Sequence, residues 1–424
     1  MKAAIAQALY STLLRLGTPL FLARLWWRGR REPAYRRHWA ERLGGGRRRA
    51  APGALWLHAV SLGETRAATP LVEALRQARP GLRLLLTHGT ATGRAAGKAL
   101  LQAGDVQVWL PYDTPGAVRR FLARHRPALG VLMETEIWPN LLHAARTAQV
   151  PMLLANARLS EKSARKGRRW AALLQPAVAS LRQVLAQTAE DAARLRAAGA
   201  GEVQVCGNLK FDQTPPAKLV ALGLQWRQAL ARPVVLGAST REGEEATLLA
   251  AWSRLAAPRP LLLLVPRHPQ RFEEVEALIR QSGMSLRRRS SLDVAMLADA
   301  SAVDVWLGDS MGEMPLYYGL SDVALLGGSF EPLGGQNLIE AAACGCPLVM
   351  GPHTFNFADA AERSLAAGAS IRVDDMAHAV TRAAALATDS ARNRWVEAAL
   401  AFASAHRGAA RAMAGAILSN WPKG

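Results

Sequence analysis

The sequence is poor in cysteine and in acidic residues. Its 424 residues include three cysteines, Cys206, Cys344 and Cys346, which are too few for a disulfide framework and indicate a reducing compartment. Asp and Glu number 33 against 53 Lys and Arg, so the formal net charge is +20. Half of the residues are apolar, which excludes a disordered or collagen-like chain. At roughly 150 residues per domain, the length predicts two or three domains.

Several motifs of metal and nucleotide chemistry are also missing. The sequence has no Asp-x-Asp metal motif, no H-E-x-x-H, no G-x-S-x-G and no G-x-G-x-x-G after a predicted strand. Residues 93–98 (GRAAGK) depart from a phosphate-binding P-loop, because three residues instead of four separate the glycines and Ala99 replaces Ser or Thr. We therefore expect no metal and no cofactor. Cys344 and Cys346 are predicted to be buried thiols.

The positive charge is concentrated at the N-terminus. Residues 1–50 hold twelve Lys and Arg and two Glu, which is half of the net charge. Residues 3–27 are apolar apart from Arg15 and Arg24, and no A-x-A-like cleavage site follows them. The pattern predicts an uncleaved membrane anchor or an interfacial helix, with Trp26 and Trp27 at headgroup depth and the arginines against anionic lipid. The alternative is a solvated helix of the domain. Nucleic acid is not expected as a partner, because zinc-finger and RNP-like motifs are absent.

Apolar segments alternate with helical patterns from residue 54 onward. Ten segments read as buried strands: 54–59, 82–87, 106–110, 128–133, 151–155, 233–237, 260–265, 303–307, 322–327 and 347–350. Helical periodicity is found in residues 66–79, 93–103 and 116–125. This alternation predicts parallel sheets covered by helices on both faces.

A polar segment with two prolines, residues 211–218 (FDQTPPAK), separates two α/β halves of similar size. We expect an N-terminal helix over residues 1–28, one Rossmann-like domain over 29–218 and another over 219–424, whose last helix packs back on the first domain. Ligands of such sheets bind outside the carboxyl ends of the strands. The active site is therefore expected at strand-end loops that face a central cleft.

Polar residues follow the predicted strands of the first half. Glu64 lies in the first turn of a helix after strand 54–59, where it either interacts with the helix dipole or acts as a general base. Residues 134–140 (ETEIWPN) follow the fourth strand, and two carboxylates beside Trp-Pro favour a site. The basic run 158–169 suits an anionic substrate, although such runs are usually solvated surfaces.

The second half has a comparable set of loops. Lys210 closes a strand just before the linker. Arg267 lies between two prolines at the end of a strand, where a rigid cation suits a phosphate or carboxylate. Residues 309–314 and 327–330 form further strand-end loops, and residues 334–340 form a glycine-rich loop that opens a helix.

These segments together resemble the 3-deoxy-D-manno-octulosonic acid (Kdo) transferases of lipopolysaccharide core biosynthesis, which are GT-B glycosyltransferases. The resemblance rests on six motifs that span nearly the whole chain in the family's order: HAVSLGE (58–64), METEIWPN (133–140), GNLKFD (207–212), PRHPQRF (266–272), GDSMGEM (308–314) and GGSFEPLGGQNLIEAAACGCPLVMGP (327–352). It implies a GT-B fold, CMP-Kdo as donor, a lipid A precursor as acceptor and a place at the cytoplasmic face of the inner membrane.

The resemblance also implies roles for individual residues. Glu64 stands where the family has its catalytic base, and Glu134 and Lys210 stand where groups assist the transition state. The positions at which the family contacts CMP are here Pro266, Arg267, Gly312, Glu313, Met314, Asn337, Leu338, Ile339 and Glu340. Two alternatives stay open: another GT-B enzyme that uses a UDP-sugar, as transferase or epimerase, and a non-catalytic basic protein that binds membranes.

Overall fold

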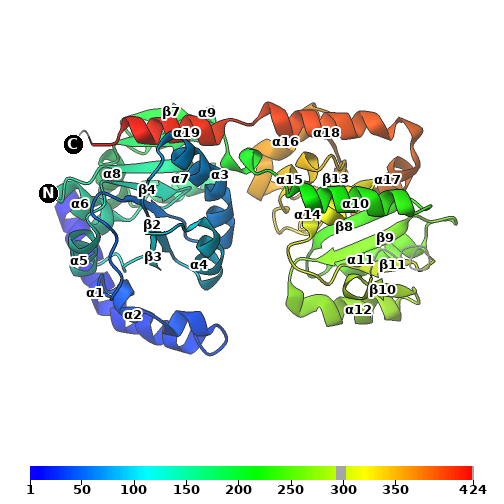
Figure 1. The fold of residues 1–424 in the computed structure, drawn as a ribbon, viewed down its shortest axis with the longest axis horizontal. Helices are drawn as coiled ribbons and strands as arrows, with labels where there is room; N and C mark the ends of the chain where they lie inside the picture. Colours follow the sequence, from blue (N-terminus) through cyan, green and yellow to red (C-terminus); the bar gives the residue numbers. More distant parts are fainter. Residues whose placement is uncertain (293–301, 423–424) are drawn as a thin grey trace. The chain divides into compact units, whose positions relative to one another are not determined.

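The computed structural model describes residues 1–292 and 302–422. Its contacts divide the chain into two compact units, the first formed by residues 1–213 together with 407–424 and the second by residues 214–406. Each unit is built on a seven-stranded sheet in which every strand pair is parallel. The α/β class and the parallel sheets predicted from the sequence are confirmed (Figure 1).

The sheet of the first unit has the strand order β3-β2-β1-β4-β5-β6-β7. Its strands are β1 (Leu55–His58), β2 (Leu84–His88), β3 (Val106–Trp109), β4 (Leu129–Met133), β5 (Met152–Ala157), β6 (Gln183–Ala186) and β7 (Val203–Val205). The order reverses direction between β1 and β4, which pair in register from Leu55 opposite Leu129. In an open parallel sheet this reversal is where ligands bind.

Helices cover both faces of this sheet (Figure 1). They are α1 (Lys2–Arg28), α2 (Trp39–Arg42), α3 (Leu62–Ala78), α4 (Ala91–Gly97), α5 (Pro115–His125), α6 (Pro139–Thr147), α7 (Glu161–Arg168), α8 (Ala171–Ala179), α9 (Ala189–Ala197) and α19 (Ala409–Ser419), with short 3-10 helices η1 (Pro33–Arg36), η2 (Lys98–Leu100) and η3 (Leu209–Asp212). Alternate residues of the strands enter two apolar clusters, one holding Trp56 and the other Leu57. Both strand faces are therefore buried, which explains the continuous apolar runs in the sequence.

The second unit repeats this plan with the strand order β10-β11-β9-β8-β12-β13-β14. Its strands are β8 (Val234–Thr240), β9 (Leu261–Pro266), β10 (Leu286–Arg288), β11 (Val305–Leu307), β12 (Val323–Leu326), β13 (Leu348–Met350) and β14 (Ser370–Arg372). Its helices are α10 (Ala217–Ala229), α11 (Glu244–Ser253), α12 (Phe272–Gln281), α14 (Met314–Leu320), α15 (Leu338–Ala343), α16 (Ala358–Ala366), α17 (Met376–Thr388) and α18 (Asn393–Ala405), with 3-10 helices η4 (Pro269–Arg271), η5 (Arg289–Ser291), η7 (Phe355–Phe357) and η8 (Ser390–Arg392).

All ten predicted strands are present, and four further strands were missed. Three of the missed strands, β7, β10 and β14, are three residues long, and each lies at the edge of its sheet. The fourth, β6, is four residues long and begins with Gln183. Short edge strands with polar residues lack the apolar run that identified the buried strands.

The last helix of the chain belongs to the first unit. Helix α19 packs against α3, and Met413 and Ile417 lie in the core cluster that contains Leu57. Its N-terminus is held by Asp212, whose carboxylate accepts hydrogen bonds from the backbone N–H groups of Gly408 and Ala410, both at 2.6 Å. Asp212 was read as the start of a linker, but it caps this helix from another part of the unit.

Some arginines of the N-terminal segment interact with the first unit itself. No helix in residues 1–292 and 302–422 is both long enough and apolar enough to cross a membrane, and α1 contains Pro19. Part of the N-terminal charge is structural: Arg42 is buried over the ring of Trp109 at 4.2 Å, and Arg48 donates to the carbonyl of Gln107 at 3.1 Å. Burial lowers the pKa of Arg42 to about 10. The expectation that the N-terminal arginines as a set face lipid is therefore wrong for Arg42, which is buried, while Arg48 is exposed.

Replacing Asp212 with Ala should loosen α19. Two backbone donors at its N-terminus lose their carboxylate partner, and loss of a cap costs about 1–2 kcal/mol. We expect the free energy of unfolding of the first unit to fall by that amount and proteolysis after residue 407 to accelerate. Urea unfolding and limited proteolysis measure the two effects. The exposed Asp375→Ala change, which removes a cap in the second unit, is the control that should leave α19 protected. If α19 were equally protected from proteolysis in both variants, Asp212 would not be its cap.

Candidate active site

The candidate site of the first unit lies at the carboxyl ends of three adjacent strands, β1, β4 and β5. Glu64 follows β1, Glu134 and Glu136 follow β4, and Arg158 follows β5. Lys210 lies in η3, after the edge strand β7. Glu134 and Lys210 both act on the pKa of Glu64, and Glu134 and Glu64 both act on the pKa of Lys210. The fold therefore brings the three predicted residues Glu64, Glu134 and Lys210 into one electrostatic cluster.

Glu64 is held by a capping box at the start of α3. Ser61 is the N-cap and accepts a hydrogen bond from the backbone N–H of Glu64 at 3.4 Å. The Glu64 carboxylate accepts in return from the backbone N–H of Val60 at 2.8 Å and from the Ser61 hydroxyl at 3.0 Å. The cap therefore fixes the carboxylate beside the end of β1, and the base role of Glu64 stays a prediction.

Glu134 has a backbone conformation that is rare for its residue type. Its φ is +56°, while its N–H still donates to the carbonyl of Ala155 on the neighbouring strand at 2.9 Å. Residues other than glycine are held in the left-handed region only when their surroundings fix them, and such residues cluster at functional sites. The Glu134 carboxylate lies 3.8 Å from the Arg158 guanidinium.

Lys210 depends on an asparagine that the sequence reasoning did not single out. Asn156, near the end of β5, has φ +51°, a conformation that Asn tolerates better than most residues. Its Oδ1 accepts from the backbone N–H of Leu209 at 3.0 Å, and the next residue is Lys210. Asn156 therefore positions the short helix that carries the cation. In the sequence, the position of an Asn inside an apolar strand could have indicated this role.

A second carboxylate, Glu136, lies next to a buried histidine. The Glu136 Oε2 accepts from the Trp138 indole at 2.8 Å and lies 3.9 Å from Nε2 of His58. His58 Nδ1 lies 3.1 Å from the Thr87 carbonyl and 2.9 Å from the Thr87 hydroxyl. Burial lowers the pKa of His58 to about 3, so this ring is neutral, and its Nε2 has no hydrogen-bond partner among the residues described.

Burial and mutual repulsion set the charges of the cluster. Burial raises the pKa of Glu64, and Glu134 adds to this, whereas the hydrogen bonds and Lys210 act in the opposite direction. Burial raises the pKa of Glu136 to about 7, with a further contribution from Glu64. Burial lowers the pKa of Lys210, while Glu134 raises it. The cluster therefore places a buried cation beside carboxyl groups, of which Glu64 and Glu136 have raised pKa values.

The predicted donor-binding residues of the second unit lie in loops at the carboxyl ends of its strands. Pro266 ends β9, and the N–H of Arg267 donates to the carbonyl of Thr240 at the end of β8 at 2.9 Å. Arg267 and Glu340 both affect the pKa of Tyr318, so these two predicted residues lie near the same ring. Strands β8 and β12 are neighbours at which this sheet reverses its order.

The remaining predicted donor residues fall into two kinds. Glu313 is partly exposed and pairs with Arg289 at 2.9 Å, beside the exposed Gly312 and ahead of Met314. Asn337 caps α15 by accepting from the N–H of Ile339 at 3.2 Å. The side chains of Leu338 and Ile339 are buried in the core, so any ligand contact at these two positions uses the backbone.

Two further outcomes concern metals and thiols. In the described parts of the chain, no group of three or more His, Cys, Asp or Glu side chains is placed to hold a metal ion. Cys346 is fully buried and Cys344 is partly buried, and burial raises the pKa of Cys344 to about 12. The prediction of a buried thiol therefore holds fully for Cys346 and in part for Cys344.

Comparisons with known proteins place the chain among relatives. A family model described as "3-Deoxy-D-manno-octulosonic-acid transferase (kdotransferase)" matches residues 37–213. The 3-deoxy-D-manno-octulosonic acid transferase of Bordetella pertussis is 49% identical over 422 residues, which cover 96% of this chain and 97% of the relative. The enzyme of the same name from Haemophilus influenzae is 35% identical over 395 residues, 91% of each chain.

A likeness among solved structures concerns the fold alone. A glycosyltransferase from Rickettsia africae ESF-5 aligns with a TM-score of 0.58 and 14% identity, covering 87% of this chain and 100% of that chain. The two parallel-sheet α/β units thus resemble those of GT-B glycosyltransferases, as the sequence predicted.

Replacing Glu136 with Gln should change how stability depends on pH. A carboxyl whose pKa rises to about 7 on folding stabilises the folded state below its ordinary pKa of about 4.5, and this contribution disappears as pH rises through 7. Gln carries no charge and can still accept from Trp138. We therefore expect Glu136→Gln to raise the free energy of unfolding by about 1–3 kcal/mol more at pH 8 than at pH 5. Chemical unfolding at both pH values, with exposed Glu73→Gln as control, measures this difference. Equal effects at both pH values would show that Glu136 is ionised in the folded state throughout.

Proposed function

Because the chain belongs to the Kdo transferases, a family of glycosyltransferases, we propose that its donor is CMP-Kdo and its acceptor the lipid A precursor lipid IVA. The observation that carries this proposal is the cluster of Glu64, Glu134 and Lys210. All three residues predicted to carry the chemistry come from different parts of the sequence and interact at one edge of the first unit.

The proposed reaction is a single displacement. Glu64 accepts the proton of the acceptor hydroxyl as that oxygen forms a bond to the anomeric carbon of Kdo. The bond from this carbon to the phosphate oxygen breaks on the opposite face, its electron pair leaves with CMP, and the configuration inverts. The capping box supports this role, because it holds the carboxylate in one orientation while burial raises its pKa towards that of a base useful near neutral pH.

Glu134 and Lys210 are proposed to stabilise the transition state. Positive charge develops on the sugar ring, and the fixed Glu134 carboxylate is suited to stabilise it. Negative charge develops on the leaving phosphate, and we assign its compensation to Lys210. A buried ammonium group interacts more strongly than one in water, which supports this assignment. Because Lys210 supplies a positive charge and the proposed donor has only one phosphate, we propose that the reaction needs no metal.

We assign donor binding to the second unit. Arg267 is an exposed guanidinium on a loop whose backbone is fixed by Thr240, which suits a phosphate or a carboxylate. Asn337 and Glu340 at the start of α15 carry polar groups suited to ribose and base, while Leu338 and Ile339 contribute backbone only. Pro266, Gly312, Glu313 and Met314 complete the set that the family resemblance implies.

The location proposed for the enzyme is the cytoplasmic face of the inner membrane. Both proposed substrates are anionic, and lipid IVA is anchored in a bilayer by its acyl chains. The N-terminal surplus of basic residues supports contact with anionic lipid. We expect no nucleic-acid partner.

The proposal predicts transfer of Kdo to lipid IVA and its loss in Glu64→Gln. Gln can replace Glu in a capping box, so the variant keeps its fold while losing the base. We expect mass spectrometry to detect Kdo on lipid IVA with the wild-type enzyme and kcat to fall at least ~100-fold in Glu64→Gln. Glu73→Gln on the same helix is the matched control, because Glu73 is exposed and its replacement removes the same charge.

Three results would overturn the proposal or parts of it. Near wild-type kcat in Glu64→Gln would remove Glu64 as the base. Thermal stabilisation by UDP but not by CMP would assign a UDP-sugar donor instead. Absence of any transfer, together with membrane binding, would favour the non-catalytic alternative.

A further inference from the structure

Helix α1 is attached to the first unit through its polar face. Gln7 and Ser11 both donate to Oδ1 of Asn140, at 2.6 and 2.8 Å, and the Tyr10 hydroxyl donates to Asp113 at 2.9 Å. Ser11 is 7% exposed. Over residues 7–11 α1 thus turns polar side chains inward, the reverse of the usual surface helix. Leu14, Leu22 and Leu25, farther along the helix, are partly buried.

The opposite face of α1 is apolar and uncovered. Ile5, Leu9, Leu13, Leu16 and Leu20 are 60%, 59%, 60%, 72% and 73% exposed. Their spacing of three and four residues places them in one line along the helix. We call these five residues the apolar stripe. A contiguous stripe of large exposed aliphatic side chains marks a surface that meets a membrane or a partner.

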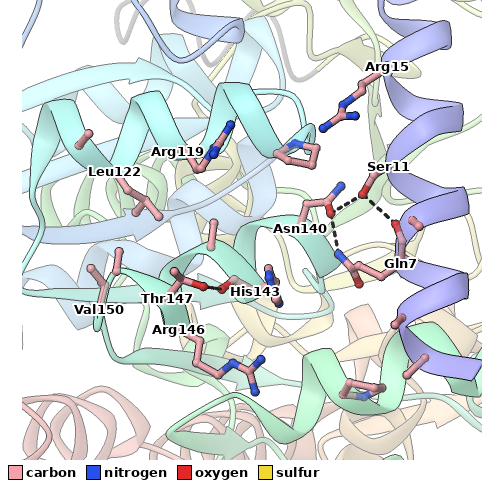
Figure 2. Close-up of a pocket in the computed structure, with 18 of the residues that line it drawn as sticks. Gln7, Ser11, Arg15, Arg119, Leu122, Asn140, His143, Arg146, Thr147 and Val150 are labelled. Carbon is pink, nitrogen blue, oxygen red and sulfur yellow. Dashed lines mark hydrogen bonds between the residues drawn. The ribbon is translucent and has the colours of Figure 1, made fainter. Parts of the chain in front are cut away.

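A cavity of about 1090 Å³ lies beside α1, between this helix and α5, α6 and α8. Figure 2 shows Arg15 from α1 and Arg119 from α5 at one end, and His143 and Arg146 from α6 at the other. Arg126 also lines it. Among the described residues that line the cavity, none is Asp or Glu. We call this cavity the α1 groove.

The cations of the α1 groove lack protein anions. In the described part of the chain, the guanidinium groups of Arg15, Arg119, Arg126 and Arg146 have no hydrogen bond and no ion pair. Asp113 does not neutralise them, because it is 5% exposed and its carboxylate is occupied by Tyr10 and by the backbone of α6. Four unpaired like charges around one cavity favour an anionic occupant.

The rest of the lining mixes apolar and polar side chains. Its apolar part includes Ala4 and Ala8 of α1 with Leu122, Ala144 and Val150, and its polar part includes Gln7, Ser11, Asn140 and Thr147. The volume is far larger than one phosphate ion needs and matches sites for larger amphipathic molecules. The groove also shares α1 with the apolar stripe, which favours an occupant with both a charged head and an apolar body.

We propose that the α1 groove binds the headgroup of an anionic phospholipid while the apolar stripe enters the acyl region of the same leaflet. This goes beyond the proposed function, since it assigns a lipid site away from the strand ends that carry the chemistry, and it rests only on the proposed membrane location. The phosphate meets the guanidinium groups, and the upper acyl chains lie along the alanines of α1. Binding would therefore depend on the charge of the lipid and not only on its hydrophobicity.

The test compares two sets of three arginines with the same change in charge. Arg15→Gln/Arg119→Gln/Arg146→Gln removes three of the four groove arginines, and Arg254→Gln/Arg287→Gln/Arg382→Gln removes three exposed arginines of the second unit. Vesicle flotation with phosphatidylglycerol and phosphatidylcholine measures bilayer binding, and calorimetry with monomeric dihexanoyl phosphatidylglycerol measures the groove itself. We expect one lipid site in the wild type, its loss in the groove variant, and about 100-fold weaker binding of that variant to phosphatidylglycerol vesicles. The control variant should bind as the wild type does.

Three results would overturn the proposal. These are unchanged lipid binding in the groove variant, an equal loss in the control variant, and binding of inorganic phosphate as tight as that of the short-chain lipid. If the triple variant does not fold, the single variant Arg119→Gln replaces it, and the same changes in lipid binding are expected at a smaller size. Kdo transfer to detergent-dispersed acceptor should persist in the groove variant, so failure of the lipid site and failure of the proposed activity are distinguishable.

Discussion

The electrostatic contact between Lys210 and its neighbouring carboxylates is the interaction on which the candidate site depends. A buried ammonium group is stable only where anions compensate its loss of hydration, and Glu134 and Glu64 provide that compensation. The carboxylates in turn need the cation, because burial and mutual repulsion raise the pKa of Glu64 and Glu136. The sheet order makes this cluster possible, since β1, β4 and β5 are neighbours and end at the same edge.

The same unit carries a second distinctive surface at its N-terminus. Helix α1 places Gln7, Tyr10 and Ser11 against the domain and leaves leucines exposed on its outer side. The positive charge of this region also divides by role. Arg42 stacks on Trp109 in the interior, whereas Arg15 extends into the α1 groove.

Apolar runs were sufficient to predict the sheets and the strand ends at which the site lies. They predicted ten of the strands, because a strand buried on both faces is apolar without interruption. The three carboxylates after β1 and β4 were found because they interrupt this pattern. Asn156 was missed, since its role depends on a backbone turn at φ +51° and on a hydrogen bond to Leu209, which lies far along the chain. The cap that Asp212 provides was hidden for the same reason, because its partners are almost two hundred residues away.

The pH dependence of kcat in a Lys210→Met variant measures the coupling between this cation and the proposed base. Met keeps the unbranched apolar stem and removes the charge that lowers the pKa of Glu64. If Lys210 and Glu64 form one electrostatic unit, the acidic limb of the kcat profile should move to higher pH, as kcat falls. A lower kcat with the acidic limb unmoved would show that Lys210 acts without influencing Glu64, and it would contradict the coupled site.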